Sequence, residues 1–114
     1  MIITWLIINA RGLDQAITNA LIKTADQMGY NPHYYTTTPW FSGIGGWWSS
    51  EDPSIQIYCT SQSEAFRLRK ALRATASINS VDKERRNPLQ GHLLFHYTDE
   101  DGNEAEQQPA RRTG

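Results

Sequence analysis

The chain has 114 residues, a net charge of −1, one cysteine and four tryptophans, and its length fits one domain with a hydrophobic core. The single cysteine, Cys59, excludes an internal disulfide framework and a multi-cysteine metal site. No apolar run approaches the ~20 residues that span a bilayer, and the start lacks a signal-peptide pattern, so we expect a cytoplasmic protein without membrane contact.

The first part of the chain predicts a strand, a helix and a second strand. Residues 2–10 are almost all apolar, which is typical of a central strand covered on both faces. Residues 14–28 have helical spacing, and their expected inner face consists of Ile17, Ala20, Leu21, Thr24 and Met28. Gly29 suits the C′ position after this helix, and Pro32 prevents its continuation. Residues 33–41 are rich in β-formers and predict the second strand.

The second part predicts a strand, a helix and a last strand. Residues 54–60 alternate in polarity, with an expected inward set of Ile55, Ile57 and Cys59. Residues 61–64 match a capping box, which opens a helix to about residue 76 with an inner face of Ala65, Leu68, Leu72 and Thr75. Residues 92–98 predict the last strand.

The predicted order, β-α-β-β-α-β, resembles the ferredoxin-like arrangement. That resemblance of element order implies an α+β fold with a four-stranded antiparallel sheet and both helices on one face. We expect a single domain over residues 1–98 and a flexible polar tail over 99–114. This fold hosts many unrelated functions, so it does not indicate a chemistry.

No arrangement of side chains in the sequence predicts catalysis. Cys59 belongs to an inward alternation set, and a buried free cysteine is usually inert. Two of the three histidines, His92 and His96, would share a strand face roughly 13 Å apart, which is too far for shared coordination. The acids at 51–52 and 99–101 lie in turn-like segments, where carboxylates are commonly solvated. We therefore expect no catalytic residue, no metal site and no cofactor, and not an enzyme.

A glycine-rich segment at 43–46 is flanked by aromatic residues. It would join two strands rather than precede a helix, so it does not fit a phosphate-binding loop. The glycines instead allow a sharp turn that brings together Trp40, Phe41, Trp47 and Trp48. Two interpretations stay open for these rings. They cap one end of the core, or they form an exposed anchor for a protein partner.

The near-neutral total charge hides a strong partition along the chain. Residues 1–66 carry a balance of −3, residues 67–86 one of +5, and residues 87–114 one of −3. The basic residues of the middle segment are Arg67, Arg69, Lys70, Arg73, Lys83, Arg85 and Arg86. They form either a solvated helix face or a patch that binds phosphates or an acidic protein surface.

The sheet face away from the helices offers a third candidate surface. Trp5, Tyr58 and an aromatic residue of the last strand could form a stacking platform similar to that of an RNA-recognition motif. The third strand departs from that motif, because Tyr58 is its only aromatic residue and it has no basic residue or glycine. The alternative is that the aromatic loop, the tail or a second subunit covers this face.

These patterns favour a small, non-catalytic interaction protein that binds a protein partner through the glycine- and tryptophan-rich loop and the basic helix. By analogy, small regulators and phage-type inhibitors of host defence complexes have this character. The alternative is a binder of single-stranded nucleic acid or of a nucleotide, which would use Trp5 and Tyr58 for stacking and the basic segment for phosphates. A homodimer through the sheet face is compatible with both.

Overall fold

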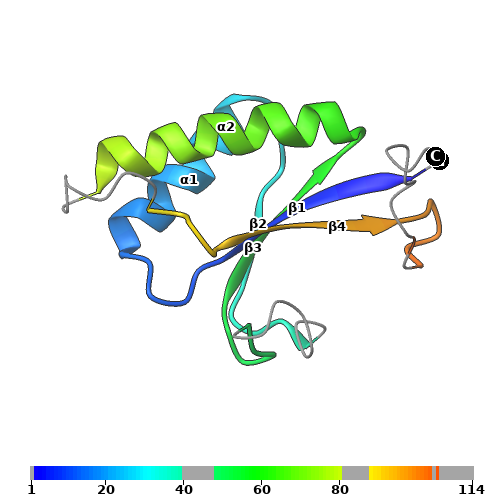
Figure 1. Ribbon diagram of the computed structural model, residues 1–114, viewed down its shortest axis with the longest axis horizontal. Helices are drawn as coiled ribbons and strands as arrows, with labels where there is room; N and C mark the ends of the chain where they lie inside the picture. The colour runs from blue at the N-terminus through cyan, green and yellow to red at the C-terminus, as the bar shows by residue number, and fades with distance from the viewer. Residues whose placement is uncertain (1, 40–47, 81–87, 104, 106–114) are drawn as a thin grey trace, which may run out of the picture.

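The helices and strands follow the predicted order. The computed structural model describes residues 2–39, 48–80, 88–103 and 105 (Figure 1). The elements are β1 (Ile3–Asn9), α1 (Gln15–Gln27), β2 (His33–Tyr35), β3 (Ser54–Cys59), α2 (Gln62–Asn79) and β4 (Leu93–Thr98). The four strands form an antiparallel sheet of order β2-β3-β1-β4, and both helices pack on one face. The predicted α+β, ferredoxin-like topology is therefore confirmed.

β1 lies at the centre of the sheet, because it pairs with both β3 and β4. Its alternate residues Leu6 and Ile8 belong to the core under the helices. Ile7 faces the other way and packs with Trp48, and Trp5 is partly buried beside it. The nearly unbroken apolar sequence of β1 is thus explained by burial on both faces.

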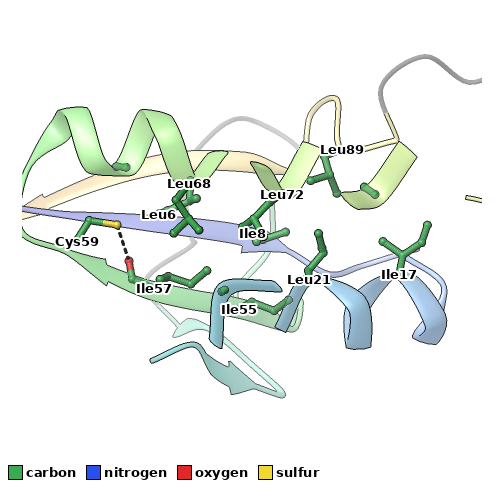
Figure 2. Close-up of a cluster of buried hydrophobic side chains, with 13 residues drawn as sticks. Leu6, Ile8, Ile17, Leu21, Ile55, Ile57, Cys59, Leu68, Leu72 and Leu89 are labelled. Carbon is green, nitrogen blue, oxygen red and sulfur yellow. Dashed lines mark hydrogen bonds between the residues drawn. The ribbon is translucent and has the colours of Figure 1, made fainter. Parts of the chain in front are cut away.

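The main core lies between the sheet and the two helices (Figure 2). Its buried members are Leu6, Ile8, Ile55, Ile57 and Cys59 from the sheet, Ile17, Leu21 and Ala25 from α1, Ala65, Leu68, Leu72 and Ala76 from α2, and Leu89. The inward set predicted for β3 is therefore confirmed. Each large aliphatic side chain buried here stabilises the fold by about 1.5–3 kcal/mol relative to exposure.

The inner face of α1 differs from the predicted one. The buried residues are Ile17, Thr18, Leu21 and Ala25, whereas Met28 is 44% exposed. Met28 is the C-cap residue, so it lies past the last full turn that faces the sheet. The helix ends as predicted, because Gly29 has the left-handed φ of +93° that glycine adopts without strain.

α2 begins at the predicted N-cap and ends three residues later than expected. The Ser61 hydroxyl accepts a hydrogen bond from the backbone N–H of Glu64, and the Glu64 carboxylate accepts one from the N–H of Thr60. Both bonds satisfy amides at the start of the helix. Ala76 completes the buried face where Thr75 was predicted; Thr75 instead hydrogen bonds with Thr24 of α1.

The second strand is much shorter than the segment 33–41 that was predicted. Only His33–Tyr35 pairs with β3, and residues 40 and 41 lie outside the described residues. After Tyr35 the chain no longer follows β3 as a strand. The buried Thr38 is held instead by two other hydrogen bonds: its hydroxyl bonds with the Ser54 hydroxyl at 2.7 Å, and its N–H donates to the carbonyl of Ser50. Among the helices of the described chain, none is long and apolar enough to cross a membrane.

Candidate functional site

Trp48 covers part of the sheet face opposite the helices. Its side chain is only 7% exposed and packs against Ile7, and its indole N–H donates to the carbonyl of Gly91 at 3.0 Å. Trp48 thus does not cap an end of the main core; it lies on the opposite sheet face, in agreement with the alternative that the aromatic loop covers that face. The other loop aromatics, Trp40, Phe41 and Trp47, lie outside the described residues.

A buried polar pair holds the same region in place. The side-chain N–H of Asn9 and the backbone N–H of Ser49 both donate to one carboxylate oxygen of Asp52, each at 3.0 Å. Burial alone would raise the pKa of Asp52, but these two hydrogen bonds and the charge of Arg11 lower it below its ordinary value. Asp52 is therefore a charged structural residue, while its neighbour Glu51 is exposed.

The rest of this sheet face carries an aromatic pair in which Trp5 is partly buried and Tyr58 is exposed. Trp5 and Tyr58 lie opposite each other in β1 and β3, with ring centroids 5.5 Å apart and planes at 86°. The Trp5 indole N–H donates to the hydroxyl of Thr98, and Tyr58 is 40% exposed. The β4 residue beside Trp5 is His96, because Phe95 faces the helices. The structure thus brings together the two predicted stacking residues.

The outer face of α2 is basic and partly apolar. Arg67, Lys70 and Arg73 are exposed, and none of the three forms an ion pair within the described residues. Two apolar side chains of the same helix are also exposed, Phe66 at 42% and Ile78 at 73%. The remaining predicted basic residues, Lys83, Arg85 and Arg86, lie outside the part of the chain that the structure describes.

Arg69 differs from these cations, because two aromatic rings hold its side chain. Its guanidinium carbon lies 4.7 Å from the centre of the Phe66 ring and 5.2 Å from that of Phe95. The two rings themselves meet edge to face, with centroids 4.9 Å apart. Arg69, Leu93, Leu94 and Phe95 line a pocket of about 210 Å³ at the β4 edge. Cation–π contacts of this kind contribute about 0.5–1 kcal/mol each at exposed sites.

Arg69 was predicted as a site residue, but Phe66 and Phe95, the two phenylalanines that contact it, were not. Phe66 precedes Arg69 by three residues, and side chains three apart on a helix are neighbours. That spacing was a usable signal for the first contact. Phe95 comes 26 residues after Arg69, and only the packing of α2 over β4 brings it close.

The cysteine and the histidines of the described chain do not form a reactive set. Burial and the nearby Glu64 raise the pKa of the Cys59 thiol to about 11, and the thiol points at the carbonyl of Ile57 (Figure 2). A thiol with so high a pKa is a poor nucleophile at neutral pH. Across the described residues, no three histidine, cysteine or acidic side chains gather into a group that could hold a metal ion.

No family model, no curated protein and no solved structure matches this chain. The topology alone does not indicate an activity, since it is shared by proteins of many functions. The features of this chain that can indicate a function are therefore its exposed surfaces.

Proposed function

We propose that this chain is a non-catalytic interaction protein that binds an acidic protein surface through the outer face of α2. The observation that carries the proposal is the composition of that face. Three exposed cations, Arg67, Lys70 and Arg73, share one helix with the exposed apolar side chains of Phe66 and Ile78. Arginine and aromatic residues are enriched where proteins bind each other, and a positive patch favours an acidic partner.

The segments outside the described residues extend this proposal from the sequence. Trp40, Phe41 and Trp47 would serve as apolar anchors, and Lys83, Arg85 and Arg86 would add charge after α2. A small regulator, such as a phage-type inhibitor of a host defence complex, is the kind of protein we envisage. A cytoplasmic location agrees with it.

The test is charge reversal on α2, with a matched charge reversal on α1. The partner is first captured from a lysate of the native host, with nuclease treatment, and identified by mass spectrometry. Its affinity is then measured for the triple variant Arg67→Glu, Lys70→Glu, Arg73→Glu and for Lys23→Glu, which alters an exposed lysine on α1. We expect the triple variant to bind at least ~100-fold more weakly and Lys23→Glu to bind normally. Equal binding by all three proteins would refute the proposal.

The Trp5–Tyr58 pair favours a second candidate, a binder of single-stranded nucleic acid or of a nucleotide. Exposed aromatic rings on the central strands of a sheet stack on unpaired bases, each worth about 1–3 kcal/mol. The described basic residues of α2 lie on the opposite layer, which makes this the weaker candidate. Titration with a single-stranded oligonucleotide tests it. Binding should weaken steeply with salt and disappear in Trp5→Ala, and absent or salt-independent binding would exclude it.

The uncovered half of the same sheet face is also where we propose a homodimer would form. Light scattering over a range of concentrations measures this directly. A dimer through this face should become a monomer in Tyr58→Glu, since a buried unpaired charge opposes association. A monomer at every concentration would contradict it.

A further inference from the structure

The outer edge of β4 has no neighbouring strand at Leu93 and Phe95 within the described chain. The N–H of Asn9 donates to the carbonyl of His92 at 2.7 Å, so these two residues form a hydrogen-bonded pair. Because hydrogen-bonded pairs alternate along an antiparallel ladder, the backbone groups of residues 92, 94 and 96 point toward β1. The backbone groups of Leu93, Phe95 and Tyr97 therefore point away from the sheet. The carbonyl of Tyr97 agrees with this, because it accepts a hydrogen bond from the N–H of Ala105 at 2.9 Å.

Leu93 and Phe95 keep their outward backbone groups without a partner among the described residues. Two consecutive outward positions supply two N–H donors and two carbonyl acceptors along one line. Such an edge is a template for one more strand, which proteins use to bind extended peptides. Every residue of β4 from Leu93 to Tyr97 is also only partly buried, so the edge is accessible from both faces.

The side chains beside this edge specify the charge of the incoming strand. Arg69 lines the pocket at Leu93 and Phe95, and its guanidinium is held against two rings. Its N–H groups have no hydrogen-bond or ion-pair partner in the described chain. A guanidinium that is stacked in this way remains able to bind a carboxylate with two parallel hydrogen bonds. Arg73, one helical turn further, adds charge on the same side of α2.

We infer that the β4 edge binds an extended acidic segment of a protein partner as a fifth strand. The backbone of that segment bonds with Leu93 and Phe95, an apolar side chain enters the pocket, and a carboxylate meets Arg69. The inference rests on the proposed function, since it names the chemistry of the same acidic partner. A second copy of this chain is a poorer occupant, because antiparallel pairing of two β4 edges would bring two Arg69 cations to one site.

A displayed library of random 12-residue peptides, selected against the full chain, is the first test. We expect the selected peptides to carry an aspartate or glutamate flanked by apolar residues at alternate positions. Methylation of alternate backbone nitrogens in a selected peptide should weaken binding by more than about tenfold, because each removes a ladder hydrogen bond. The largest amide chemical-shift changes should fall on Leu93 and Phe95. A library without binders, peptides without acids, or shifts confined elsewhere would overturn the inference.

Matched substitutions separate this inference from the proposed function. Arg69→Gln should weaken binding of the selected peptide by more than about tenfold, while Lys23→Gln, at an exposed lysine of α1, should leave it unchanged. Arg69→Lys keeps the charge and should restore only part of the affinity, because it lacks the planar fork. Circular dichroism establishes that each variant is folded.

The outcomes are distinguishable. Partner binding that is lost in the triple charge-reversal variant of α2 but unchanged in Arg69→Gln would sustain the proposed function and overturn the edge site. Partner binding that is unchanged in the triple charge-reversal variant and in Arg69→Gln would overturn the proposed function and the edge site together. A concentration-dependent dimer whose β4 amides shift on association would overturn the acidic segment in favour of a second copy.

Discussion

The two faces of the sheet differ in how completely they are covered. Under the helices, Leu6, Ile8, Ile55 and Ile57 are fully buried. On the opposite face, Ile7 of β1 is buried under Trp48, whereas Tyr58 of the neighbouring strand β3 is 40% exposed. The same alternating strands thus supply a continuous core on one side and a divided surface on the other. We infer from this burial that the helix-covered face contributes more to the stability of the fold than the opposite face does.

The largest effect is expected from a cavity under the helices. Leu6→Ala should lower the free energy of unfolding by about 2–5 kcal/mol, because it removes buried methyl groups and leaves a space that the close-packed core fills only in part. Urea unfolding measures the change. A loss below about 1 kcal/mol would mean that the helix-covered face is less tightly packed than its burial indicates.

The reactivity of the Cys59 thiol measures how tightly the helix-covered face is packed without a mutation. Its pKa of about 11 lies about two units above the ordinary value of 9.0, which reduces the thiolate fraction about 100-fold at pH 7. A disulfide reagent should therefore label the native protein at least ~100-fold more slowly than the chain unfolded in guanidinium chloride. Equal rates would show that the core beneath α2 opens readily.

Asp52 lies in the part of the opposite face that Trp48 covers, and its lowered pKa predicts that the stability of the fold depends on pH. A carboxyl whose pKa is lower in the folded than in the unfolded chain stabilises the fold at pH values above its ordinary pKa of 3.8. That contribution is lost as the pH falls through the lower folded value. Asp52→Asn should cost about 1–3 kcal/mol at pH 7 and flatten the stability profile below pH ~5. Glu51→Gln, at the exposed neighbour, should leave the profile as in the wild type, and a flat wild-type profile would refute this role.

The smallest effect is expected at the uncovered aromatic pair. Tyr58→Ala should lower the free energy of unfolding by only about 0.5–1.5 kcal/mol, which is the range for an aromatic cross-strand pair. Tyr58→Phe, which keeps the ring, should be close to neutral. Thermal unfolding followed by circular dichroism measures both. A loss as large as that of Leu6→Ala would mean that the two faces are equally important for stability.

Much of the fold could be predicted because its signals are local. The alternation of residues 54–60 identified the inward side of β3, and Ser61 with Glu64 identified the start of α2. The position of Trp48 could not be derived in this way, because its indole binds Gly91, 43 residues later in the chain. The burial of Thr18 likewise depends on the angle at which α1 packs on the sheet and on α2, which its own spacing does not specify.

The candidate site likewise combines features that are visible within one segment of sequence with features that depend on contacts between distant segments. The basic character of α2 is visible in composition, but seven basic residues between 67 and 86 look alike in the sequence. What distinguishes Arg69 is a pair of rings, of which Phe95 belongs to another element. The free backbone groups of Leu93 and Phe95 beside it depend on which strand β4 pairs with and on the register of that pairing. Both are properties of the assembled sheet.

The central place of β1 has a consequence for how the molecule folds. Ile3 is in register with Thr98, so the first strand of the chain reaches its last neighbour only when that strand has been synthesised. Contacts between such distant residues make folding slow relative to helical proteins of similar size. Until β4 arrives, one side of β1 remains an unpaired apolar edge. The interval between the synthesis of β3 and β4 is therefore the stage at which this chain is most exposed to aggregation and to chaperones.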